Sequence, residues 1–214
     1  MNFIFCQAAF AQLQWDKRDL EFHPGAADTN VVARFTFANA GSHPVTILAA
    51  KISCGSCAVA ELDKKRYRPG ERGALTATFD FGQRVGLQTK SIVVQTDDRS
   101  EPNAILTFKV HIPELVKITP TLVYWLPGEP RVAKTMTVKV VHDQPINILA
   151  IKSSNGRLTA KLKTMKSGSE YEIAVIPADT KQPATAVLQV ETDYPRENPR
   201  TFNAHAMVKG SSRP

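Results

Sequence analysis

Hydrophobic and polar side chains alternate at every second position along most of this chain. Two examples are Arg34-Phe35-Thr36-Phe37 and Thr107-Phe108-Lys109-Val110. This period of two is typical of strands that bury one face, whereas the 3.6-residue period of a long amphipathic helix does not recur. The expected strands are 31–37, 45–52, 74–81, 91–96, 104–112, 135–141, 146–151, 158–162, 171–176, 186–192 and 201–208.

Turn-forming residues separate these segments. Ala40-Gly41-Ser42-His43-Pro44, Arg68-Pro69-Gly70-Glu71 and Asn155-Gly156 are examples. Gly, Pro, Asn and Asp favour turns because of their backbone freedom, fixed φ or side-chain hydrogen bonding. Short strands at regular spacing predict an all-β sandwich or barrel. The phenylalanines expected in its core are Phe35, Phe37, Phe79, Phe81 and Phe108.

The two halves of the chain resemble each other. Residues 44–51 (PVTILAAK) reappear as residues 145–152 (PINILAIK), and Val94-Gln95-Thr96-Asp97 reappears as Val190-Glu191-Thr192-Asp193. A repeat of about 100 residues is too long for a solenoid unit and indicates two whole domains in tandem. The expected division is a first domain at 12–112, a linker at 113–115, a second domain at 116–210 and a tail at 211–214.

Charge and composition exclude some function classes. The chain has 214 residues and a formal net charge of +7, with most of the excess in residues 114–214. It lacks the dense basic stripe, RNP-type aromatics or zinc finger of nucleic-acid binders, so no nucleic-acid partner is expected. After residue 11, no stretch approaches the roughly 20 apolar residues of a membrane helix. Binding of an anionic envelope polymer by the basic second domain stays a weaker alternative.

The first eleven residues predict export. Residues 1–11 hold no charge, and Phe3-Ile4-Phe5-Cys6 leads into an A-x-A pattern at Ala9 and Ala11. These features are typical of a secretory signal peptide, although a basic n-region is missing. The expected location is the periplasm or cell envelope.

A family resemblance rests on motifs spread over the first half. They are Leu13-x-Trp15, Phe35-Thr36-Phe37-x-Asn39-x-Gly41, Pro44-Val45-x-Ile47, Ser53-Cys54-Gly55, Tyr67-x-Pro69-Gly70-Glu71, Gly86 and Thr96-Asp97. Residues 13–112 resemble the bacterial family of unknown function numbered 1573, which is related to the immunoglobulin-like ASH and major-sperm-protein domains. The resemblance implies two tandem immunoglobulin-like β-sandwiches in an envelope protein with no established activity. Its turn and loop residues here are Asn39, Gly41, Gly55, Pro69 and Gly70.

Cys54 and Cys57 form the sharpest chemical feature. Family members commonly read Cys-Gly-Cys-Thr where this chain reads Cys54-Gly55-Ser56-Cys57, and the second half has no cysteine there. A C-x-x-C pair can be a structural disulfide, a redox pair or half of a metal site. Zinc would need further Cys or His ligands at suitable spacing, which are missing, and copper could use a loop histidine such as His43. No cofactor is expected, and the five histidines show no ligand spacing.

The sequence therefore favours a non-catalytic exported scaffold or protein-binding module. It contains no G-x-S-x-G elbow, phosphate loop or EF-hand loop, so no catalytic residue is expected. The acids Asp97-Asp98 and Glu191-Thr192-Asp193 are interpreted as turn residues. A protein partner could add to a sheet edge. The alternative is a thiol-redox or copper-handling protein that acts through Cys54 and Cys57.

Overall fold

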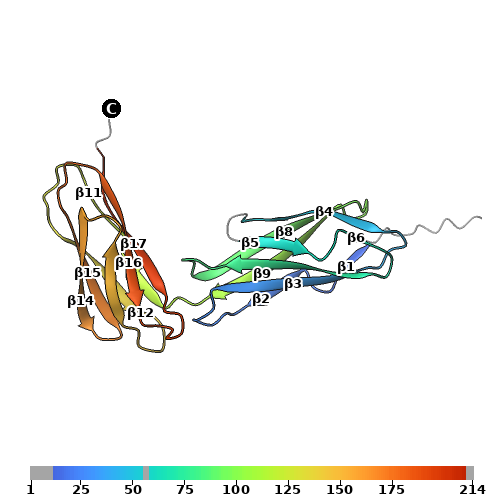
Figure 1. Ribbon diagram of the computed structural model, residues 1–214, viewed down its shortest axis with the longest axis horizontal. Coiled ribbons are helices and arrows are strands. Elements are labelled where there is room, and N and C mark those ends of the chain that lie inside the picture. Colours follow the sequence, from blue (N-terminus) through green and yellow to red (C-terminus); the bar gives the residue numbers. More distant parts are fainter. Residues whose placement is uncertain (1–11, 55–57, 211–214) are drawn as a thin grey trace, which may run out of the picture. The chain divides into compact units, whose positions relative to one another are not determined.

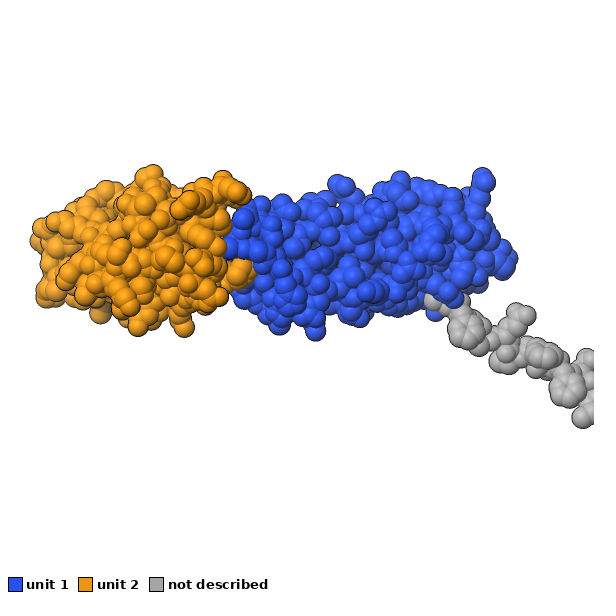
Figure 2. All heavy atoms as spheres, turned by 90° about the horizontal axis from the view of Figure 1, so that it is seen from below, with its two compact units in different colours: residues 1–112 blue, residues 113–214 orange. Residues whose placement is uncertain are grey.

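The computed structural model describes residues 12–54 and 58–210, and every regular element among them is a β-strand. The chain divides into two compact units, residues 1–112 and residues 113–214 (Figure 2). The predicted all-β fold is confirmed, with each unit built as an immunoglobulin-like sandwich. Within the described residues, no helix could cross a membrane.

Unit 1 consists of two sheets that enclose one core (Figure 1). The four-stranded sheet has the order β1-β3-β7-β5, and the five-stranded sheet has the order β2-β9-β8-β4-β6. The strands are β1 (Leu13–Trp15), β2 (Asp19–Phe22), β3 (Asn30–Asn39), β4 (Val45–Ile52), β5 (Ala58–Leu62), β6 (Arg66–Tyr67), β7 (Arg72–Asp80), β8 (Gly86–Thr96) and β9 (Asn103–Ile112).

Unit 2 repeats this arrangement with two four-stranded sheets, β10-β12-β15-β14 and β11-β17-β16-β13. Its strands are β10 (Val116–Thr119), β11 (Leu122–Trp125), β12 (Lys134–Val140), β13 (Ile148–Ser153), β14 (Leu158–Lys166), β15 (Glu170–Pro177), β16 (Ala184–Thr192) and β17 (Thr201–Val208).

The first strand of each unit is split between the two sheets. In unit 1, β1 pairs antiparallel with β3, and β2 then pairs parallel with β9 in the other sheet. In unit 2, β10 pairs antiparallel with β12, and β11 pairs parallel with β17. The internal repeat seen in the sequence is therefore a repeat of topology.

Side-chain alternation places the aromatic residues in the cores. All five phenylalanines expected in the core of unit 1 are at most 1% exposed, and they contact residues from both sheets. Trp125 is fully buried in unit 2. Burial of each such side chain contributes roughly 1.5–3 kcal/mol to the free energy of folding.

The matched octapeptides form β4 and β13, which carry the same irregularity. The register shifts at Leu48 in β4 and at Leu149 in β13, and both leucines are exposed, at 60% and 63%. A bulge of this kind leaves one residue unpaired and increases the local twist. The two units therefore share the position of a bulge as well as the order of their equivalent strands.

The acids that directly follow β8 and β16, Asp97 and Asp193, bind equivalent backbone groups. The Asp97 carboxylate accepts the Thr46 N–H at 2.7 Å, and the Asp97 N–H donates to the Thr46 carbonyl at 3.1 Å. In unit 2, Asp193 and Asn147 repeat both bonds, at 2.8 and 3.1 Å. These acids serve as structural clamps, in agreement with their interpretation as turn residues.

Six short strands have no counterpart among the strands expected from the sequence: β1, β2, β5, β6, β10 and β11. Each has two to five residues and lies at the edge of its sheet. Such segments are too short to display a period of two. A strand at the edge of a sheet also needs fewer buried apolar side chains, so its sequence shows a weaker pattern.

The buried carboxylate of Asp98 ties the start of β1 to the turn between β8 and β9. Asp98 is 5% exposed and accepts the Gln12 N–H at 2.8 Å, the Ser100 N–H at 2.9 Å and the Ser100 hydroxyl at 2.6 Å. Burial by itself raises the pKa of Asp98, but the hydrogen bonds from Ser100 and Gln12 outweigh it and hold the pKa below its usual value.

This depressed pKa predicts a loss of stability in acid. The contribution of Asp98 is complete above the pKa of the unfolded chain, about 4, and is lost as the pH falls through the lower folded value. Asp98→Asn should lower the free energy of unfolding at neutral pH by roughly 1–3 kcal/mol. Urea unfolding as a function of pH should also show a shallower acid decline in this variant than in the wild type. Asp80→Asn, at an exposed position, is the control, and parallel pH profiles for Asp98→Asn and the wild type would contradict the assignment.

Candidate functional site

Cys54 lies two residues after the end of β4, partly buried against the core of unit 1, and it is disulfide-bonded. Gly55 and Cys57 lie outside the described residues, so the predicted pairing with Cys57 stays a prediction. His43 precedes β4 while Cys54 follows it. An eight-residue strand separates the two by roughly 25 Å, so His43 does not join Cys54 in a copper site.

Asn39 joins two loops at the opposite end of β4. It is fully buried, and its side-chain amide donates to the carbonyls of His43 at 2.8 Å and Tyr67 at 3.0 Å. Its side-chain oxygen accepts the Gly41 N–H at 3.0 Å. A Cβ on Gly41 would lie 2.5 Å from Gln12, so this position has no room for a larger residue. The family-motif residues here hold the loops together.

The second of these loops is a tight turn from Arg68 to Glu71. The Glu71 N–H donates to the Arg68 carbonyl at 3.0 Å, and Gly70 has φ of 78°, a value that favours glycine. Pro69 precedes it, as in a type II turn. The Gly70 N–H also donates to the Asn39 carbonyl at 2.7 Å, which fastens the turn to β3.

Tyr67 anchors this region in the core. The residue is fully buried, and its hydroxyl lies within hydrogen-bond distance of the Asp63 carboxylate and of the Lys64 carbonyl. Burial, together with the hydrogen bond to Asp63, raises the pKa of Tyr67 well above its usual value. The phenol therefore stays protonated and serves as a structural donor.

A basic pocket of about 500 Å³ opens beside this turn. It is lined by Pro44, Lys64, Arg66, Arg68 and Glu71. Lys64 pairs with Glu71, and this hydrogen bond, with that from the Arg68 N–H, holds the pKa of Glu71 below its usual value. Arg68 also lowers the pKa of Glu71 through its charge, and Arg66 adds a further guanidinium group to the lining. The pocket therefore has a net positive charge, with Glu71 as its one acidic lining residue.

The longest edge strand belongs to unit 2. β14 has nine residues and pairs only with β15, whereas its counterpart in unit 1, β5, has five. Lys161 and Lys163 are exposed on the same face of β14, and no ion-pair partner is found for either among the described residues. Lys166 ends the strand. β14 thus presents unpaired backbone groups beside several lysines.

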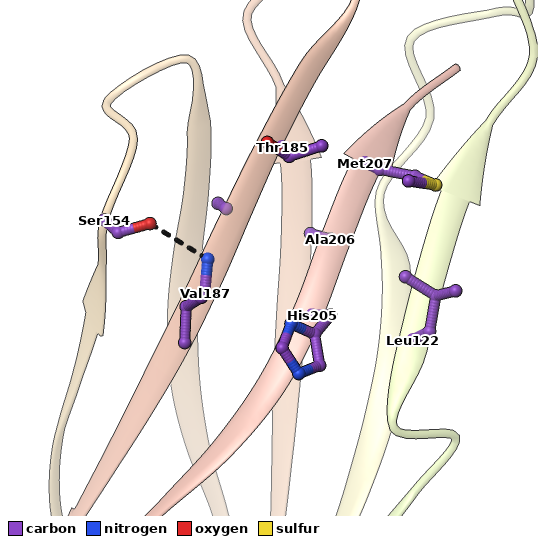
Figure 3. Close-up of a pocket in the computed structure, with 8 residues that line it drawn as sticks. Leu122, Ser154, Thr185, Val187, His205, Ala206 and Met207 are labelled. Atoms are coloured by element: carbon purple, nitrogen blue, oxygen red, sulfur yellow. Dashed lines mark hydrogen bonds between the residues drawn. The ribbon is translucent and has the colours of Figure 1, made fainter. Parts of the chain in front are cut away.

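The outer face of the β11-β17-β16-β13 sheet carries an apolar groove of about 340 Å³ (Figure 3). His205 lies directly between Leu122 of β11 and Val187 of β16. Ser154 borders the groove and its hydroxyl accepts the Val187 N–H at 2.9 Å. No acidic side chain lines the groove, so nothing there orients His205 as a general base.

Two features of these surfaces escaped the sequence analysis. The basic run at residues 64–68 belongs to the half of the chain that is less basic in total. His23 and His111 are far apart in the sequence, yet their rings stack with centroids 4.4 Å apart. The cluster of basic residues was readable in the sequence, whereas the histidine pair depends on the parallel pairing of β2 with β9.

Comparisons with known proteins add a family but no activity. A search of curated proteins finds no match. Solved structures with a similar arrangement include a protein of unknown function from Porphyromonas gingivalis W83, which is 14% identical with a TM-score of 0.35 and covers 92% of this chain and 99% of that chain. The Pseudomonas aeruginosa CupB2 chaperone is 11% identical, with a TM-score of 0.36 and coverage of 89% and 99%. The E. coli chaperone DraB is 14% identical, with a TM-score of 0.37 and coverage of 90% and 95%.

These identities and TM-scores are too low to carry an argument about function. The family comparison is more specific, because the family model described as "Protein of unknown function (DUF1573)" matches residues 13–112. This segment contains Asn39, which joins two loops, and the Pro69-Gly70 turn. The similarity to the DUF1573 family therefore covers residues 13–112, within unit 1.

Proposed function

We propose that this protein is a non-catalytic exported module of the cell envelope, and that it binds a protein partner by pairing β14 with an extended acidic segment. The observation that carries the proposal is the nine-residue free edge of β14. An edge strand presents a row of N–H and C=O groups that can pair with another chain.

The other edge strands of the described sheets are less suitable for such pairing. They have two to six residues, against nine in β14. β13, with six residues, also carries the bulge at Leu149, which increases twist and interrupts the ladder. β14 has a register shift of its own at Met165, but its seven residues from Leu158 to Thr164 pair regularly with β15, so this strand still offers the longest regular template.

The lysines determine which partner the edge accepts. Lys161 and Lys163 would face the same lysines, or neighbouring ones, if two copies paired edge to edge, and like charges on adjacent strands repel. A segment with acidic residues at alternate positions would instead place its carboxylates beside them. The excess of basic residues in the second half of the chain attracts the same partner at longer range.

The surfaces of the described residues support a binding role more than a catalytic one. The apolar groove lacks a carboxylate beside His205, and the buried Asp98 is fully engaged with backbone and hydroxyl donors. The proposed role of the protein is therefore to bind its partner and not to catalyse a reaction.

A thiol-redox role remains the second candidate, because Cys54 is disulfide-bonded. Disulfides persist in oxidising compartments, so the bond also supports export. When the protein is produced with passage through an oxidising periplasm, intact mass should show loss of residues 1–11, and thiol counting should show no free Cys54. An uncleaved chain with a free Cys54 thiol would contradict export. A Cys57→Ser variant with unchanged disulfide reactivity would contradict the redox role.

Binding through β14 can be tested with an eight-residue peptide that alternates Glu and Val. Lys161→Glu combined with Lys163→Glu should weaken binding by about tenfold, since each cross-strand charge pair contributes up to about 1 kcal/mol. Fluorescence anisotropy with a labelled peptide measures this change.

Two controls separate strand pairing from general charge attraction. Lys117→Glu combined with Lys209→Glu makes the same charge change in unit 2, in β10 and after β17, and should leave affinity within about twofold. A peptide with Pro in place of Val keeps the charge but cannot pair as a strand, so it should not bind. Equal binding of both peptides would instead favour general binding of anionic polymers.

A further inference from the structure

We propose that Glu21, His23 and His111 form a binding site for Zn²⁺ on unit 1. The site is independent of the β14 edge and uses none of the cysteines. It rests on three potential ligand atoms that lie within 4.8 Å of one another.

The pairing of β2 with β9 brings these residues together. The two strands run parallel, with Glu21 opposite Lys109 and Phe22 opposite Val110, so that His23 follows beside His111. Phe22 packs edge-on against Phe108, with ring centroids 6.4 Å apart. Because side chains alternate along a strand, Glu21 and His23 then share the outward face with His111.

Both imidazoles converge on one carboxylate oxygen. The Glu21 Oε1 atom lies 2.6 Å from the Nε2 of His111 and 3.6 Å from the Nε2 of His23. Tetrahedral coordination at about 2.0–2.1 Å places ligand atoms roughly 3.3 Å apart. The observed separations lie on either side of this value, so the ion could replace the hydrogen bond between His111 and Glu21.

One ring must turn for the ligands to meet the ion. The rings of His23 and His111 are stacked with an angle of 8° between their planes, and the nitrogen lone pairs lie in those planes. The His23 side chain is 70% exposed and makes no hydrogen bond within the described residues, so it can rotate into place. The His111 side chain, 38% exposed and fixed on β9, provides the more rigid ligand.

The ligand types select the ion. Imidazole nitrogen with one carboxylate suits Zn²⁺ and its first-row neighbours, whereas Ca²⁺ and Mg²⁺ require mostly oxygen ligands. The protein supplies three ligands, which leaves a fourth position for water or for a donor from another molecule. Bound Zn²⁺ would also fasten the four-residue edge strand β2 to β9.

Titration calorimetry on untagged protein with alkylated thiols tests the site directly. Zn²⁺ should bind with 1:1 stoichiometry, and Ca²⁺ or Mg²⁺ should not bind. His23→Ala and His111→Ala should each weaken Zn²⁺ binding by at least about tenfold, the scale that even outer-shell partners reach. Glu21→Gln should weaken binding as well.

Matched variants keep this test decisive. His43→Ala removes an exposed histidine elsewhere in unit 1 and should leave Zn²⁺ binding unchanged. Lys109→Met removes the cation opposite Glu21 and should leave binding unchanged or tighten it. Circular dichroism without metal should show that each variant is folded. Zn²⁺ binding that is absent from the wild type, or that survives both His23→Ala and His111→Ala, would overturn the proposal.

Discussion

A β-strand points its side chains alternately to opposite faces, and the rest of this structure depends on that constraint. A sheet with one apolar face must bury it against a second sheet, which accounts for the two sandwiches and for the phenylalanine-rich core of unit 1. Burial of the faces leaves the edges unpaired, because an open sandwich does not close as a barrel does. What the protein can bind is therefore decided at its edges and loops.

The edges of the two units differ, although the strand order is the same apart from β6, which has no counterpart in unit 2. In unit 1, the strand at the edge next to β7 is short, and the loop before it carries the disulfide-bonded Cys54. In unit 2, the corresponding strand extends to nine residues and gains Lys161 and Lys163. The family motif stays in unit 1, where Asn39 holds the loops beside the basic pocket. The two copies of the fold thus differ in their edge strands and in the loops beside them.

Much of the fold was predictable because periodicity is a local property. The alternation predicted β4 and β17 with the bounds that the structure shows. The octapeptide repeat predicted two equivalent strands, and the structure adds a matching bulge in each, at Leu48 and Leu149. The bounds of edge strands were predicted less well. β14 was expected to end at Leu162 but continues to Lys166. An edge strand does not need alternating apolar residues, so its end leaves no clear sequence pattern. The proximity of His23 and His111 could not be predicted, because no local sequence pattern shows which strand pairs with β2.

The most direct test of the central claim is backbone hydrogen exchange, measured by NMR with and without the alternating Glu-Val peptide. Pairing at the edge predicts new protection at alternate amides of β14, those whose N–H groups point away from β15, with the amides of β5 unchanged. Protection confined to the apolar groove or to unit 1, with β14 amides exchanging as before, would contradict the account.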